Sequence, residues 1–228
     1  MKRKCWCGSQ LDYHDCHEAF DKKLKQYKKH GYLIPNHKMI KNEKQIEAIK
    51  RAAVVNNGLL DYIEEHIQIG MTTQDIDDMA VAYTSSHGGY SADLNYEGYP
   101  KSICTSVNDE VCHVIPGGYV LQDGDIINVD ATTGVNGYYA DASRMSMLGH
   151  VSEEAQRLVK VTKECLEEGM KAVKPWESTI ADIGTAIEKH AHANGYSVVE
   201  EFCGHGIGKA MHEDPYVYHY TPKEKTVL

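Results

Sequence analysis

The chain has 228 residues, of which 42% are hydrophobic and 25% charged, and its formal net charge is −9. This composition is typical of a globular protein that can bury a core. No apolar run approaches the roughly 18 residues needed to cross a bilayer, and the basic N-terminus lacks the apolar segment of a secretory signal. We therefore expect a cytoplasmic protein without a membrane partner.

The charge is unevenly distributed along the chain. Residues 1–50 carry 12 Lys and Arg against 6 Asp and Glu, whereas residues 51–228 carry 12 against 27. A basic head on an acidic body indicates two parts with different partners, although a solvated helix face would give the same pattern.

The N-terminal 20 residues concentrate the metal-binding residue types. The chain has seven cysteines, and an odd number argues against a disulfide framework. Cys5, Cys7, Cys16 and His17 provide four soft ligands within a short segment, as a tetrahedral structural zinc requires. We predict a zinc motif at residues 1–20, with scattered free thiols as the alternative. The pattern resembles the short zinc-binding tail of the bacterial preprotein translocation ATPase.

A basic stretch follows at residues 21–39, which we interpret as a linker or a short helix. Its lysines, together with Tyr27, are of the types that contact RNA or a ribosome surface. The main domain is expected at residues 40–228.

Within the main domain, apolar periodicity and capping residues predict helices at residues 42–67, 72–89, 152–171 and 179–194. Short β-branched or alternating runs predict strands at residues 102–107, 110–116, 125–132, 138–148 and 196–202. Because helices and hairpins are segregated along the chain, we expect an α+β fold and not a parallel doubly wound sheet.

Several enzyme classes lack their signatures in this sequence. It has no phosphate-binding G-x-x-x-x-G-K-[ST] loop, no G-x-S-x-G serine hydrolase motif and no H-E-x-x-H zinc helix.

Two aspartates, Asp130 and Asp141, flank an expected turn at Gly134–Gly137. Two like charges in a half-buried place repel each other and resist the loss of water. A shared proton, a nearby cation or a bound metal would offset that cost.

Three histidines lie near the ends of apolar runs: His113, His205 and His212. His205 stands between Gly204 and Gly206, where the backbone can approach a ligand closely. A single histidine is more often a hydrogen-bonded polar residue than a ligand. Histidines combined with two carboxylates suit Mn, Fe(II), Co or Zn, and such ligands hold paired hydrolytic metals in aminopeptidases.

The segments at residues 98–116, 123–132, 137–145 and 203–215 closely resemble type I methionine aminopeptidase. The resemblance covers residues 40–228 and implies a pseudo-symmetric pita-bread α+β fold around two divalent metal ions. It further implies a metallo-exopeptidase that removes the initiator methionine from nascent chains when the second residue is small. A proline-specific peptidase of the same fold is the alternative within enzymes.

The resemblance also assigns roles to residues of this sequence. It implies that Asp130 binds one metal, that Asp141 bridges both metals, and that His205 is a further metal ligand. Peptide or nascent-chain N-termini would be the substrates of a monomeric enzyme, with the ribosome as a candidate partner.

The substrate is expected to meet a second set of residues. The resemblance implies that His113 and His212 contact the substrate and assist catalysis. It implies that Tyr96, Tyr99 and Cys104 line the methionine side-chain pocket, for which ordinary core packing is the alternative.

The sequence also departs from the family pattern. Val114 follows His113 in place of glycine, Ala142 follows Asp141 in place of threonine, and Asp93 stands where the pocket often has a small neutral residue. The family carries two further glutamate ligands in a segment expected beyond Leu228. On this basis we expect a C-terminally incomplete catalytic domain lacking its last strands, and the alternative function is a binding module acting on ribosome or RNA.

Overall fold

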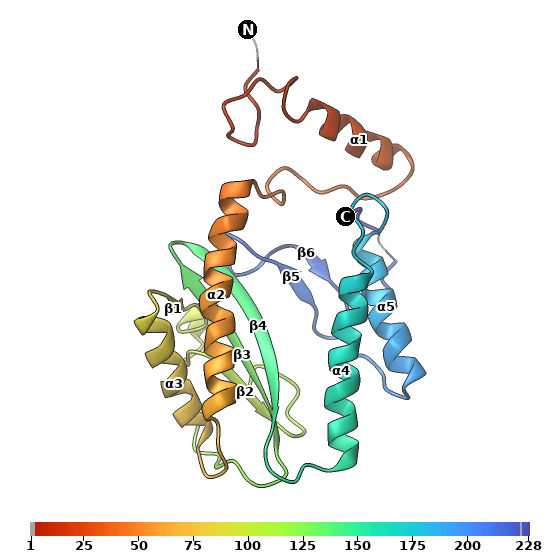
Figure 1. Ribbon diagram of the computed structural model, residues 1–228. Coiled ribbons are helices and arrows are strands. Elements are labelled where there is room, and N and C mark those ends of the chain that lie inside the picture. The colour runs from red at the N-terminus through yellow and green to blue at the C-terminus, as the bar shows by residue number, and fades with distance from the viewer. Residues whose placement is uncertain (1–2, 224) are drawn as a thin grey trace. The chain divides into compact units, whose positions relative to one another are not determined.

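The computed structural model describes residues 3–223 and 225–228. These residues form two compact units, and Figure 1 labels the elements of each. The first unit comprises the described residues of 3–42, 160–206 and 213–228, and the second comprises residues 43–159 and 207–212. No helix among the described residues is long and apolar enough to span a membrane.

The second unit is built on an antiparallel sheet covered by two helices (Figure 1). Its elements are α2 Glu43–His66, α3 Thr73–Ser86, β1 Tyr90–Ser91, the 3-10 turn η1 Tyr96–Gly98, β2 Cys104–Val107, β3 Ile126–Val135 and β4 Tyr138–Met147. Strand β3 is central, because β4 pairs with it along its whole length and both β1 and β2 also pair with it.

The core of this unit lies between the helices and one face of the sheet. Leu59 and Ile63 of α2 and Ile76 of α3 pack against Ile127 and Val129 of β3. Side chains alternate between the two faces of a strand. Because the odd-numbered residues of β3 enter this core, its even-numbered residues face away from the helices.

A two-residue turn joins β3 to β4. Val135 pairs with Tyr138, and the intervening Asn136 and Gly137 have φ values of 50° and 76°. Positive φ at both positions is the type I′ geometry that matches the twist of a hairpin, and Asn-Gly is its preferred sequence. The expected hairpin around residues 134–137 is therefore confirmed.

The first unit contains α1 Glu18–Lys29, α5 Ile180–Ala193, β5 Gly204–Gly206 and β6 Glu213–Val217. Helix α4 Glu153–Lys171 begins in the second unit and continues in the first. Within the first unit, Val161 and Cys165 of α4 pack with Ala191 of α5 in a small apolar cluster. Thr179 and Asp182 form a capping box that begins α5.

Two expected strands are wrong. Residues 196–202 form no strand, because Tyr196 and Val198 instead pack on the apolar cluster between α4 and α5. Residues 110–116 form a loop. His113 there has a φ of 58°, which interrupts the extended conformation that a strand requires. In the basic stretch at residues 21–39, the part that ends at Lys29 belongs to helix α1.

Candidate metal centres and active site

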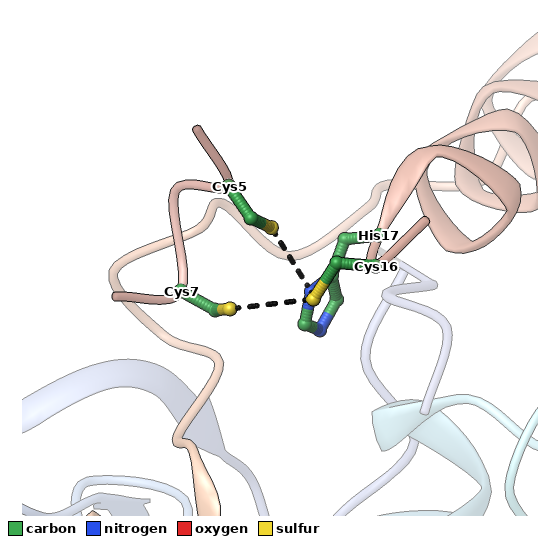
Figure 2. Close-up of side chains that lie close together, drawn as sticks. All are labelled: Cys5, Cys7, Cys16 and His17. Carbon is green, nitrogen blue, oxygen red and sulfur yellow. Dashed lines mark hydrogen bonds between the residues drawn. The ribbon is translucent and has the colours of Figure 1, made fainter. Parts of the chain in front are cut away.

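The four N-terminal ligand residues converge on one point. The ligand atoms of Cys5, Cys7, Cys16 and His17 all lie within 4.8 Å of one another, and Figure 2 shows their side chains directed inward. The sulfur atoms of Cys7 and Cys16 are 3.6 Å apart. Two sulfur atoms bound to a tetrahedral zinc at about 2.3 Å would lie about 3.8 Å apart, so the donor set and its spacing fit such an ion.

The thiol and imidazole groups already interact in this arrangement. His17 Nδ1 lies 3.2 Å from Cys5 Sγ and 3.0 Å from Cys16 Sγ. Hydrogen bonds from the side chain and backbone of Ser9 lower the pKa of Cys7 to about 6. The thiolate is the form that binds a metal, so a lowered pKa favours metal binding by Cys7 near neutral pH.

A buried carboxylate holds the ligand loop on helix α1. Asp21 is 8% exposed, and it accepts hydrogen bonds from Trp6 Nε1 at 3.2 Å and from the Tyr13 hydroxyl at 2.7 Å. His37 Nε2 lies 3.0 Å from its second oxygen, and the His37 ring stacks on Trp6 at 4.0 Å. The sequence analysis did not identify this network. The signal for it in the sequence was Trp6, which stands between the ligand cysteines Cys5 and Cys7.

In the second unit, the hairpin places Asp130 and Asp141 on the same face of the sheet. Asp141 lies opposite Thr132, two residues from Asp130 on β3. Residues two apart share a face, and diagonal neighbours across two strands lie within about 7–8 Å. This is the face turned away from the apolar core.

The two aspartates influence each other. Burial, followed by the charges of Asp141 and Asp93, raises the pKa of Asp130 to about 7. Such a carboxylate needs a proton or a cation to be stable. Of the explanations left open by the sequence, a divalent ion fits the oxygen ligands.

Asp93 is held against strand β3. Its Oδ2 accepts a hydrogen bond from the backbone N–H of Thr132 at 3.0 Å. Burial raises the pKa of Asp93 to about 6, and the charge of Asp141 acts in the same direction.

Tyr99 and Cys104 border the same region. Cys104 on β2 lies directly opposite Asp130 on β3. Burial raises the pKa of Cys104 to about 12. The Tyr99 hydroxyl donates to the carbonyl oxygens of Ile103 at 3.0 Å and Val114 at 3.2 Å, and its own pKa is raised by burial.

The histidines of the second unit lie on irregular backbone. His212 Nδ1 is 3.0 Å from the Tyr96 hydroxyl, so the structure brings these two expected substrate residues together. His113 has an exposed side chain and the left-handed backbone noted above. Asn, Asp and His are the side-chain types that enter this region most readily.

His205 belongs to the first unit, on β5. Its Nδ1 lies 2.9 Å from the Gly206 carbonyl oxygen. That bond requires the proton on Nδ1 and leaves the lone pair on Nε2, which is the common arrangement of a metal-ligating histidine. A Cβ atom at Gly206 would lie 2.3 Å from the Asp214 carbonyl oxygen, which explains the glycine beside His205.

Residues 47–228 match the model of metallopeptidase family M24. The chain belongs to this family. Residues 3–19 match the SEC-C motif, which includes the four converging ligands of the N-terminal cluster. Membership of M24 implies divalent metal ions, and the carboxylates described above are suitable ligands.

Among the similar proteins is methionine aminopeptidase A of Synechocystis, 49% identical over 180 residues, which cover 78% of this chain and 71% of the relative. Methionine aminopeptidase of Chlamydia pneumoniae is 37% identical over 225 residues, which cover 96% of this chain and 77% of the relative. The second match therefore includes most of the N-terminal segment.

Solved structures of M24 enzymes share the fold. The crystal structure of methionine aminopeptidase from Rickettsia prowazekii has a TM-score of 0.78 and 39% identity, over 80% of this chain and 73% of that one. Prolidase from Pyrococcus furiosus, at 20% identity, has a TM-score of 0.71 over 83% of this chain and 54% of that one, and shows the fold alone. The expected pita-bread fold is confirmed.

Proposed function

We propose that this M24 chain is a methionine aminopeptidase that removes N-terminal methionine when the second residue is small. The observation that carries the proposal is the pair of aspartates on one sheet face, within a chain 49% identical to a methionine aminopeptidase. When bound, divalent ions polarise the scissile carbonyl group and generate a nucleophile at neutral pH.

The proposed metal ligands are Asp130, Asp141 and His205, for two ions among Mn, Fe, Co and Zn. The hairpin register supports the proposed role of the two aspartates, because it puts both carboxylates on one face of the sheet. The contact between His205 Nδ1 and the Gly206 carbonyl oxygen supports the proposed role of His205, because it fixes the imidazole tautomer.

His113 and His212 are proposed to assist the reaction. In the tautomer that accepts the Tyr96 hydroxyl proton at Nδ1, His212 carries its own proton on Nε2, from which it can be donated to charge that develops on the substrate carbonyl. Tyr96, Tyr99 and Cys104 are proposed to line the pocket for the methionine side chain.

The N-terminal cluster is proposed to bind one structural zinc ion. A segment this short buries little apolar surface, so metal binding would supply much of its folding free energy. The substrates are proposed to be peptide or nascent-chain N-termini, the enzyme a monomer, and the cytoplasm its location.

Methionine release tests the enzyme assignment. We expect the chain with added Mn(II) or Co(II) to release methionine from Met-Ala-Ser and to cleave Met-Leu-Ser at least ten times more slowly. Asp141→Asn is expected to abolish release. A wild-type chain that binds metal but releases no methionine from either peptide would contradict the assignment.

Helix α1 favours a second, accompanying function in ribosome or RNA binding. It carries five lysines against two acidic residues, and an open surface pocket of about 280 Å³ is lined by Lys23, Gln26, Tyr27, His30 and Tyr32. Cations interleaved with aromatic rings suit phosphates and stacked bases.

Co-sedimentation with ribosomes tests this second function. The double substitution Lys23→Glu/Lys28→Glu is expected to reduce the bound fraction, whereas Lys44→Glu/Lys50→Glu on α2 changes the net charge equally and should not. Equal losses in both variants would indicate only a nonspecific response to net charge.

A further inference from the structure

An ion pair joins the segment that precedes α2 to the first residue of β6. Lys41 Nζ lies 2.5 Å from Glu213 Oε2, and the two residues are 172 positions apart in the sequence. Their side chains are only 15% and 20% exposed. Salt screens such a partly buried pair less than it screens an exposed one, and removing one partner leaves the other charge without compensation.

The ammonium group of Lys41 is itself held in place. Its Nζ lies 3.3 Å from the carbonyl oxygen of Met39 and 3.4 Å from that of Lys38. An ammonium group has three N–H donors, and the two carbonyl groups together with Glu213 provide an acceptor for each of them. The carboxylate of Glu213 therefore meets a cation whose position is set by the turn of its own segment.

Glu213 occupies the irregular end of the β5–β6 ladder. It pairs with Gly206, whereas the preceding pair joins His205 to Tyr216, so the register skips two residues of β6 between these pairs. An irregularity of this kind disrupts the ladder locally. A contact from outside the ladder is therefore well placed to hold this end of the two strands.

A displacement of Glu213 would reach His205 through Gly206. The backbones are so close that a Cβ atom at Gly206 would lie 2.9 Å from the Glu213 carbonyl oxygen. The Gly206 carbonyl oxygen is in turn 2.9 Å from His205 Nδ1. Lys41 is thus connected to the imidazole of His205 by a continuous series of contacts.

We propose that Lys41 is a positioning residue of the candidate active site, which through Glu213 holds the end of β5 and β6 that presents His205. The inference rests on the proposed function for the role of His205. Lys41 acts through Glu213 and not on the substrate.

Kinetics of methionine release test the proposal. Lys41→Met keeps most of the side-chain length but lacks the charge. Because it disturbs the alignment of a reacting group and not the binding of substrate, we expect kcat to fall about tenfold with KM within about twofold of wild type. Lys41→Arg keeps the charge and should retain at least about half of the wild-type kcat.

The matched control is an exposed ion pair on α2. Lys50 Nζ lies 2.8 Å from Glu47 Oε1, and these side chains are 66% and 59% exposed. Lys50→Met changes the net charge as Lys41→Met does and should leave kcat and KM unchanged. Equal losses of kcat in Lys41→Met and Lys41→Arg, or an unchanged kcat in Lys41→Met, would overturn the proposal.

A double-mutant cycle tests whether the two residues act as a pair. Glu213→Gln keeps the shape of the side chain, so it tests the same contact even if Lys41→Met does not fold. We expect it to lower kcat to a similar extent, and the double variant Lys41→Met/Glu213→Gln to lose no more than either single variant. Losses that multiply in the double variant would show that the residues act independently, against the proposal.

Hydrogen exchange gives a readout that does not depend on activity. Backbone amides of residues 204–217 should exchange faster in Lys41→Met than in wild type, and at the wild-type rate in Lys50→Met. Exchange at the wild-type rate in Lys41→Met would overturn the inference. If Lys41→Met accelerates this exchange but wild type releases no methionine from Met-Ala-Ser, the proposed function fails while the anchoring of His205 stands.

Discussion

Replacing Gly206 by alanine should damage the active site through the strand that carries His205. Strand β5 pairs with β6 in an irregular ladder whose register shifts between His205 and Gly206. A Cβ atom at Gly206 would lie 2.3 Å from the Asp214 carbonyl oxygen and 2.9 Å from that of Glu213. Both obstacles are backbone atoms, so no side-chain rotation can relieve the overlap.

The size of the effect follows from that distance. Ordinary van der Waals contact at a Cβ atom begins at 3.4 Å, so the two strands must separate by roughly 1 Å. Overpacking of this kind costs about 1–3 kcal/mol of unfolding free energy. A displacement of about 1 Å at a reacting group can reduce catalysis about 100-fold, so we expect a loss of that order in kcat/KM for methionine release.

Gly204 provides the matched control in the same strand. Its Cβ atom would lie 3.5 Å from the Val217 carbonyl oxygen, which is an ordinary contact. We therefore expect Gly204→Ala to retain the wild-type unfolding midpoint and kcat/KM within about twofold. Equal activity and stability in the two alanine variants would refute the reasoning from backbone overlap.

Tyr99→Phe should lower the unfolding free energy by about 1–3 kcal/mol in denaturant titration, because two carbonyl oxygens lose their donor. The backbone N–H of Thr179 holds the pKa of Asp182 below its ordinary value. The ionised Asp182 carboxylate should therefore stabilise the fold fully above about pH 4, and this stabilisation should be lost as pH falls further. The unfolding free energies at pH 5 and pH 3 should differ less in Asp182→Asn than in wild type. Removal of metal from the N-terminal cluster by a chelator should expose the amides of residues 5–21 to hydrogen exchange, and Cys16→Ser should show that exchange before chelation.

The elements that local chemistry determines were predictable from the sequence. Helix α3 begins after Thr72, the first residue of the helix predicted at residues 72–89, because Thr72 and Asp75 satisfy each other's backbone N–H groups. The turn at Asn136 and Gly137 was predictable for the same reason, since those two residues favour positive φ. In both cases the information lies within a few neighbouring residues.

The two false strands show the limit of the same approach. Residues 196–202 have the composition of a strand, but a strand also needs a partner with exposed backbone groups. Tyr196 and Val198 bury apolar surface against helices instead, and short apolar runs are compatible with either outcome. That choice is made by tertiary contacts, which the local pattern does not contain.

The chemical types in the candidate site were predictable, but their surroundings were not. Asp130 and Asp141 were identified as a pair because they flank a turn. The orientation of Asp93 depends on a hydrogen bond to Thr132, which is 39 residues away in the sequence. The local sequence pattern does not contain that long-range contact, so it could not place the Asp93 carboxylate.

The hairpin register connects turn chemistry to metal chemistry. A slip of one residue between β3 and β4 would move Asp141 to the face occupied by the apolar core, where a charge is most costly. The two-residue turn prevents that slip, because its positive φ values fix Val135 opposite Tyr138 and therefore Thr132 opposite Asp141. Asn136 and Gly137 thus determine which face receives the second carboxylate, although neither residue belongs to the site.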